Sequence, residues 1–130
     1  MLHSLSIRDV VLIERLDLSF HSGLCVLTGE TGAGKSILLD ALSLALGERA
    51  DAGLVRHGAA RAVVAAEFEV DPQHPAAQIL EEQGISLDDG EPVILRRTLS
   101  ADGRSRAFVN DQAVSVALLR RVGETFVEVH

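Results

Sequence analysis

Apolar and polar residues alternate near the start of the chain, which predicts β-strands with one covered face. Residues 16–20 (LDLSF) alternate strictly, and residues 2–8 alternate more loosely. A period of two is typical of a strand that turns one face to a core and the other to solvent. Residues 24–27 (LCVL) are instead apolar throughout, as in a strand buried on both faces of a parallel sheet. We therefore expect an antiparallel subsheet beside a parallel core.

The next segment is predicted to be a buried helix. Residues 35–46 place apolar side chains on nearly all sides of a helix, so other elements should cover it. Gly47 stands where a C-cap glycine would end that helix.

The second half of the chain is predicted to contain a hairpin. Residues 92–100 and 104–110 are strand-like and flank an Asp-Gly pair, which favours a tight turn between antiparallel strands. Before the hairpin, residues 63–70 predict a further strand and residues 75–83 a short helix. A second turn is predicted at residues 110–111.

The end of the chain is predicted to be a helix followed by a strand. Ser115 can N-cap a helix over residues 116–122, and Gly123 is expected to end it. Residues 125–130 (TFVEVH) are strand-like and read as an interior strand. The predicted fold class is therefore α/β with a mixed sheet.

Length and composition fit one globular domain. The chain has 130 residues, 47% of them hydrophobic, and its single cysteine, Cys25, cannot form an internal disulfide, which fits a reducing cytosol. The start of the chain lacks the pattern of a signal peptide, and its apolar runs are far shorter than a membrane span, so we expect no membrane contact. The net charge of −7 is unusual for a free-standing nucleic-acid binder, so any DNA contact must be local or supplied by another part of the molecule.

One stretch carries recognisable chemistry. It follows the predicted buried strand, opens the predicted helix, and matches the pattern G-x-x-x-x-G-K-[ST] without a mismatch. Its residues are Gly29, Glu30, Thr31, Gly32, Ala33, Gly34, Lys35 and Ser36. A glycine-rich turn between a strand and a helix is the plainer interpretation, and the agreement of motif and context favours a phosphate cradle over it.

Each residue type in this motif has a role in holding a nucleoside triphosphate. Glycines let the backbone N–H groups of residues 32–36 turn inward around phosphate oxygens, and the helix N-terminus adds positive potential. Lys35 can carry a mobile positive charge to the β- and γ-phosphates, and the Ser36 hydroxyl can be a ligand of Mg²⁺. The motif therefore predicts a bound triphosphate with Mg²⁺.

The acidic groups and the signature loop needed for hydrolysis are not found in the sequence. Glu14 and Glu67 each end an apolar run, but neither follows the Asp that would hold Mg²⁺, and we interpret both as structural. Residues 99–103 (LSADG) only partly match the LSGG pattern of a signature loop and lie at the predicted hairpin turn. We therefore predict no catalytic residue within this segment.

Arginines gather on the two arms of the predicted hairpin, at Arg96, Arg97, Arg104 and Arg106. They can form a solvated strand face, or a patch that meets the DNA backbone or a partner subunit. Backbone contacts of the second kind need charge rather than sequence readout. The histidines are scattered without metal-ligand spacing, so we expect no zinc site.

The wider sequence resembles the N-terminal lobe of an ABC-type ATPase head in the structural-maintenance-of-chromosomes (SMC) group, with P-loop NTPase architecture. The resemblance runs along the whole chain and is greatest to the bacterial members that act in recombinational repair of DNA double-strand breaks. It rests on VLTGETGAGKSILLDAL, GERAD, LVRHG, RRTLSADGRSRAFVND and FVEVH.

This resemblance implies a head built from the two ends of one long chain, joined by a coiled coil. The 130 residues would then be a cut piece that needs the C-terminal half of the same protein. Two heads would form a homodimer around two ATP molecules, with DNA as a further partner, in the cytoplasm at the nucleoid. The resemblance also places Arg56 near the nucleotide and the DNA-facing surface.

Other functions stay open at this point. They are the nucleotide-binding lobe of an ABC transporter, a small P-loop kinase, and a chromosome-organising member of the same group. A transporter lobe usually stacks adenine on an aromatic residue upstream of the cradle, and this chain has no Tyr or Trp and only Phe20 nearby. We also expect the isolated segment to expose an unpaired sheet edge and an apolar patch, and not to turn over ATP.

Overall fold

A single six-stranded sheet forms the centre of the computed structural model, which describes residues 2–20, 32–88 and 90–127, with only the backbone of residues 32–36. The strand order is β2-β1-β3-β4-β5-β6, and every neighbouring pair is antiparallel. The strands are β1 (Leu2–Val10), β2 (Ile13–Ser19), β3 (Arg61–Phe68), β4 (Val93–Ser100), β5 (Ser105–Val109) and β6 (Gln112–Val114). The helices are α1 (Gly32–Ala45), α2 (Pro75–Glu82), α3 (Val116–Val127) and the short 3-10 helix η2 (Ala52–Leu54).

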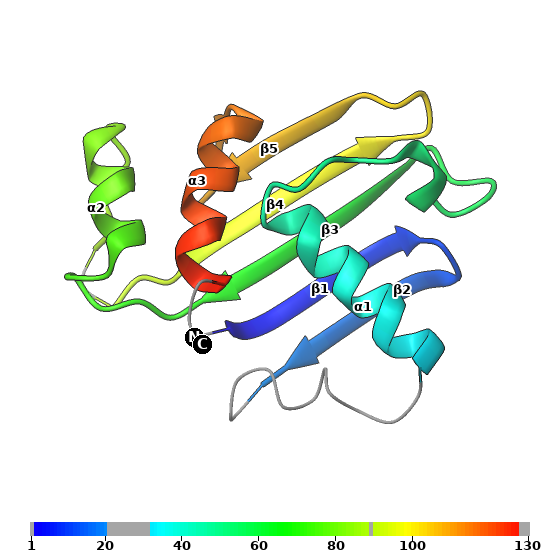
Figure 1. Ribbon diagram of the computed structural model, residues 1–130, viewed down its shortest axis with the longest axis horizontal. Coiled ribbons are helices and arrows are strands. Elements are labelled where there is room, and N and C mark those ends of the chain that lie inside the picture. Colours follow the sequence, from blue (N-terminus) through cyan, green and yellow to red (C-terminus); the bar gives the residue numbers. More distant parts are fainter. Residues whose placement is uncertain (1, 21–31, 89, 128–130) are drawn as a thin grey trace.

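The α-helices lie on one side of the sheet, and the alternation of residues in the strands explains why. In Figure 1, α1 crosses in front of the sheet, α3 lies in front of it beside α1, and α2 lies beyond α3. Along β4, Val93, Leu95 and Leu99 are fully buried toward the helices, whereas Ile94 and Thr98 on the other side are half-buried. None of the described helices covers that second side, which we call the open face.

The core lies between the sheet and the helices. α1 turns Ala41, Leu44 and Ala45 inward, and these belong to the same buried cluster as Leu5 of β1. Small alanines let a helix backbone approach a sheet closely. Leu39 points the other way and is 42% exposed, so the prediction of a helix buried on nearly all sides holds for one side only. No described element packs on its outer side.

Most strands and helices lie where the sequence pattern predicts them, including the hairpin of β4 and β5. The second turn lies where it was predicted, but an additional strand that was not predicted follows it. Asn110 and Asp111 both have positive φ, 48° and 67°, as in the two-residue turns whose twist matches antiparallel strands. The turn leads into β6, a strand the pattern missed because three residues are too few to show a period.

The predicted mixed sheet is confirmed in its antiparallel part. All five strand pairings among the described residues are antiparallel. The predicted parallel strand over residues 24–27 lies outside the described residues.

The prediction for the end of the chain is wrong. α3 does not end at Gly123 but continues to Val127, so residues 125–127 are helical rather than a strand, and residues 128–130 lie outside the described part. The helix continues because it has an apolar side to bury. The Phe126 ring stacks on Phe68 at 3.9 Å between centroids and on His74 at 5.0 Å.

Gly123 allows α3 to touch the end of α1. A Cβ atom placed on Gly123 would lie 2.3 Å from the carbonyl oxygen of Leu46.

Gly47 both ends α1 and allows a second close contact with α3. Its φ of 95° ends α1, with its N–H bonded to the Leu44 carbonyl and the Glu48 N–H to the Ser43 carbonyl, as predicted for a C-cap. A Cβ on Gly47 would meet the Arg120 backbone at 2.5 Å.

His74 caps the N-terminus of α2. Its Nδ1 accepts a hydrogen bond of 3.0 Å from the Ala76 N–H, and burial lowers the pKa of His74 from its usual 6.5. A protonated Nδ1 cannot accept this bond, so the cap requires the neutral ring.

We predict that Gly123→Ala destabilises the protein. Alanine normally stabilises a helix by about 1 kcal/mol relative to glycine. Here the added methyl would collide with the Leu46 carbonyl, and overpacking of this kind costs about 1–3 kcal/mol. Thermal or urea unfolding measures the difference. Glu124→Ala, on the exposed side of α3, is the matched control and should change stability little. A stabilised Gly123→Ala protein would contradict the close contact.

We predict that His74 makes the stability depend on pH. Because its folded pKa is lowered, the unfolded chain takes up the proton first as the pH falls below about 6.5, and the stabilising contribution present above that pH is lost. His74→Asn keeps a capping acceptor but does not titrate. Between about pH 7.5 and pH 5 the melting temperature of wild type should therefore fall more steeply with decreasing pH than that of His74→Asn. His57→Asn, at an exposed position, should follow wild type. Equal slopes for all three proteins would contradict this role.

Candidate functional site

The predicted phosphate cradle coincides with the start of α1. Gly29, Glu30 and Thr31 lie outside the described residues, and the backbone of residues 32–36 forms the first turn of the helix. The helix thus begins three residues earlier than the apolar pattern indicated. The first N–H groups of an α-helix have no partner within the helix, and they carry the positive end of its dipole. The backbone that the structure describes at the cradle is therefore suited to an anion.

The other end of α1 is held by an arginine. Arg97 is only 2% exposed, and its Nη1 donates hydrogen bonds to the carbonyls of Leu44 (3.0 Å) and Glu48 (2.9 Å). Its Nε donates to the Ser105 hydroxyl at 2.6 Å. Burial lowers the pKa of Arg97. Among the described residues it has no ion pair with a carboxylate, so the carbonyls at the end of α1 balance its charge.

The prediction that Arg97 belongs to an exposed arginine patch is therefore wrong. Adjacent residues of a strand point to opposite faces, so Arg96 and Arg97 cannot share a surface. Once residues 92–100 are predicted to be a strand, this alternation by itself places the two arginines on opposite faces.

Four other arginines do gather on the open face. Arg96, Arg104 and Arg106, all predicted, are joined there by Arg61 of β3, which the sequence pattern did not indicate. Together they line a shallow hollow, which we call the arginine surface. Between them lie Val63, Thr98, Ser100, Asp102 and Phe108. Arg61 joins this surface because it pairs with Ser100 between β3 and β4, and a local sequence pattern does not show such a pairing.

The charges of the arginine surface are only partly balanced. The Arg96 guanidinium lies 4.3 Å from the centroid of the Phe108 ring, and its Nη1 lies 3.5 Å from a carboxylate oxygen of Asp111. Arg104 has Asp102 at 3.6 Å. Within the described part of the chain, Arg61 and Arg106 have no ion-pair partner. The surface therefore carries a net positive charge in a chain whose total is −7.

Arg56 lies in a different place, beside the turn between β1 and β2. Its N–H donates to the Asp9 carbonyl at 2.8 Å, and its guanidinium lies 3.9 Å from the Asp9 carboxylate and 3.6 Å from Glu14. Glu14 thus faces an arginine. Glu67, the other acidic residue considered from sequence, lies 4.0 Å from His3.

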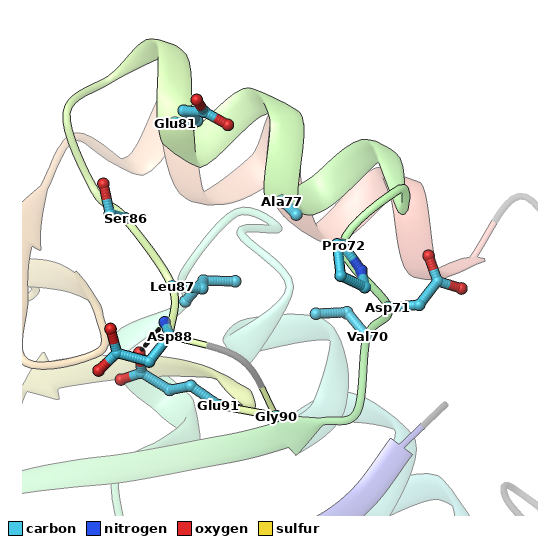
Figure 2. A pocket seen from close by; sticks show the side chains of 10 residues that line it. All are labelled: Val70, Asp71, Pro72, Ala77, Glu81, Ser86, Leu87, Asp88, Gly90 and Glu91. Atoms are coloured by element: carbon cyan, nitrogen blue, oxygen red, sulfur yellow. Dashed lines mark hydrogen bonds between the residues drawn. The ribbon is translucent and has the colours of Figure 1, made fainter.

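Figure 2 shows a separate hollow, of about 240 Å³, between α2 and the segment before β4. Val70 and Leu87 point into it from opposite sides. Its lining is Val70, Asp71, Pro72, Ala77, Glu81, Ser86, Leu87, Asp88, Gly90 and Glu91. None of these residues is basic, and four are carboxylates, so this hollow is unsuited to a triphosphate. The sequence pattern gave no signal for it.

Two kinds of feature are absent among the described residues. These residues include no helix long and apolar enough to cross a membrane. They also include no group of three or more His, Cys, Asp or Glu side chains placed to hold a metal ion.

Residues 4–117 match the family described as AAA domain. The chain is also 45% identical over 130 residues to the DNA repair protein RecN of Halalkalibacterium halodurans and 44% identical to that of Bacillus subtilis. In both alignments the whole chain is covered, but it spans only 23% and 22% of the relatives' lengths. The matched relatives are therefore about four times longer.

Solved structures of SMC ATPases have the same fold. One, from work on ATP-driven dimerization and DNA-stimulated activation of SMC ATPases, gives a TM-score of 0.69 over 95% of this chain and 78% of its own, at 22% identity. The SMC head domain from Thermotoga maritima gives 0.62 over 92% of this chain and 41% of its own, at 18% identity. The fold is thus that of the N-terminal lobe of a P-loop NTPase head, as the sequence resemblance implied.

Proposed function

We propose that this chain, which belongs to the AAA domain family, binds ATP and Mg²⁺ as the N-terminal lobe of the ATPase head of a RecN-like DNA-repair protein. One observation carries the proposal: an unbroken G-x-x-x-x-G-K-[ST] motif enters the first turn of α1 in a fold shared with SMC ATPase heads. Similarity to RecN over the whole chain favours repair over the transporter, kinase and chromosome-organising alternatives.

The chemistry of the proposed site follows from the motif and the helix. Backbone N–H groups of residues 32–36 would surround the phosphate oxygens at the positive end of α1. Lys35 would approach the β- and γ-phosphates, and Ser36 would hold Mg²⁺, which neutralises phosphate charge when bound. Gly29, Glu30, Thr31, Gly32, Ala33 and Gly34 would supply the backbone of the loop.

Turnover is proposed to need the rest of a longer protein. Glu14 and Glu67, the nearest candidates for an acidic strand end, lie beside Arg56 and His3. The Mg²⁺-holding Asp, the water-activating Glu and the signature loop would then come from the C-terminal half and from a second head. We accordingly propose a homodimer that encloses ATP between heads, acting in the cytoplasm at the nucleoid, with the 130 residues alone unable to hydrolyse ATP.

DNA is the proposed partner of the arginine surface. A locally basic area in an acidic chain is where a phosphate backbone would bind, since such contacts need charge and no base readout. The open face that carries it is free of described helices. The competing role is contact with a partner head. We further propose that Arg56 lies near the nucleotide and DNA, a role that rests on the sequence resemblance.

Lys35→Ala tests the nucleotide site. Removing the mobile charge should weaken ATP·Mg²⁺ binding by the full-length protein by about tenfold or more, since hydrogen bonds to charged groups contribute about 1.5–3 kcal/mol each. Calorimetric titration measures the affinity, and circular dichroism checks the fold. The chain has no second lysine, so Arg49→Ala, at an exposed position after α1, is the control. Equal affinity of Lys35→Ala and wild type would contradict the assignment.

The double variant Arg61→Gln/Arg106→Gln tests the arginine surface. Neither arginine has an ion-pair partner among the described residues, so the change leaves no described carboxylate unpaired. Affinity of the full-length protein for duplex DNA should fall, and the slope of log K against log salt should decrease by up to about two, near 0.9 for each lost phosphate contact.

Arg120→Gln/Arg121→Gln removes the same charge from α3, on the opposite side of the sheet, and should leave the DNA slope unchanged. If the two double variants behave alike in fluorescence anisotropy at several salt concentrations, the arginine surface does not bind DNA. A loss of head dimerisation without a loss of DNA binding would assign the surface to the partner head.

A further inference from the structure

Arg97 is a buried cation whose charge is balanced without a carboxylate. Its side chain is 2% exposed, and its described hydrogen-bond acceptors are two backbone carbonyls and one hydroxyl. Burying an unpaired charge is strongly unfavourable, so such a residue persists only where fixed dipoles replace the lost water. A leucine or methionine would fill the same strand position without that penalty.

The two carbonyls that hold Arg97 lie in the last turn of α1 and just beyond its end. The last four carbonyls of a helix have no partner within it and carry the negative end of its dipole. Leu44 lies in the last turn of α1 and Glu48 just after its cap. α1 has no basic residue of its own in that last turn, so the cation comes from β4, in the interior of the sheet.

Two close backbone contacts fix the same end of the helix. Gly47 lies against the backbone of Arg120, and Gly123 lies against the carbonyl of Leu46, each with no room for a Cβ atom. We call Arg97, Gly47 and Gly123 the C-terminal clamp. Apolar side chains along the rest of α1 hold it to the sheet through packing that is not directional. The hydrogen bonds of Arg97 are directional, and with the two glycine contacts they restrict the position of the helix along its axis and its rotation.

We propose that Arg97 is a positioning residue for nucleotide binding: by fixing the C-terminal end of α1, it sets where the first-turn amides, Lys35 and Ser36 meet the triphosphate. The inference rests on the proposed ATP site. Arg97 itself does not touch the nucleotide in this account, because a 14-residue helix separates it from the cradle by about 20 Å at 1.5 Å per residue. A rigid helix transmits a shift at one end to the other, and binding by oriented amides is sensitive to shifts of about 1 Å.

The competing explanation is that Arg97 only stabilises the fold. The two explanations differ in what a folded variant does. A purely stabilising residue, once replaced, lowers the melting temperature but leaves the nucleotide affinity of the folded molecules unchanged. A positioning residue changes the affinity at temperatures where the variant is fully folded.

The test measures binding of a fluorescent ATP analogue (mant-ATP) with Mg²⁺ to the full-length protein, well below each variant's melting temperature. Arg97→Met should weaken binding by about tenfold, the lower end of the 10–100-fold losses seen when the hydrogen-bond partners that orient metal ligands are removed. Arg97→Lys keeps the charge but loses the planar fork that serves two carbonyls and a hydroxyl, so its loss should be smaller. Val93→Ala, a buried position at the start of β4, is the control for lost stability and should bind like wild type.

The outcomes separate the two proposals. If wild type does not bind mant-ATP, the proposed function fails. If wild type binds and folded Arg97→Met or Arg97→Lys binds equally well, the positioning role is overturned. If neither arginine variant folds, the Ser105→Ala variant tests the positioning role of Arg97 instead. It removes the acceptor of Arg97 Nε and should weaken binding measurably, and wild-type affinity in that variant would overturn the role.

Discussion

The contact between the Arg97 guanidinium and the carbonyls at the end of α1 joins the helix of the phosphate motif to the interior of the sheet. It places a positive charge against the negative end of the helix dipole in a region closed to water. The opposite end of that dipole is the start of α1, where residues 32–36 form the first turn. One helix therefore has a cation fixed at its C-terminus, and its N-terminus is where we propose that an anion binds. The packing of Gly47 and Gly123 depends on the same placement.

The strand that carries Arg97 also separates two surfaces of different chemistry. Arg97 and Arg96 are neighbours in β4, yet the first faces α1 and the second faces the arginine surface on the open side. Ser105, the hydroxyl partner of Arg97, lies between Arg104 and Arg106 in the same way. The proposed nucleotide side and the proposed DNA side of this lobe thus share two strands of one sheet. Movement of β4 or β5 would therefore displace side chains on both faces of the sheet.

Much of this organisation could be predicted from the sequence, because strand alternation, turn residues and the phosphate motif are local signals. The hairpin of β4 and β5, the cap at Gly47 and the Ser115 cap, which accepts from the Leu118 N–H at 3.0 Å, were found that way. Contacts between residues far apart in the sequence could not be predicted from these local signals. Gly123 has the composition of a helix end, but its role is set by the Leu46 carbonyl, far away in the sequence. The stacking of Phe126 on Phe68 likewise overrides the strand-like pattern of the last residues. Arg61 joins the arginine surface only through strand pairing.

Hydrogen–deuterium exchange of the full-length protein with and without ATP·Mg²⁺ tests the central claim most directly. Protection should appear in peptides that cover residues 28–42, because the amides of the motif would be bonded to phosphate oxygens and the first turn of α1 would open less often. Peptides that line the acidic hollow of Figure 2, residues 70–91, should exchange at the same rate in both states. Unchanged exchange over residues 28–42, with saturating ATP·Mg²⁺ present, would contradict nucleotide binding by this motif.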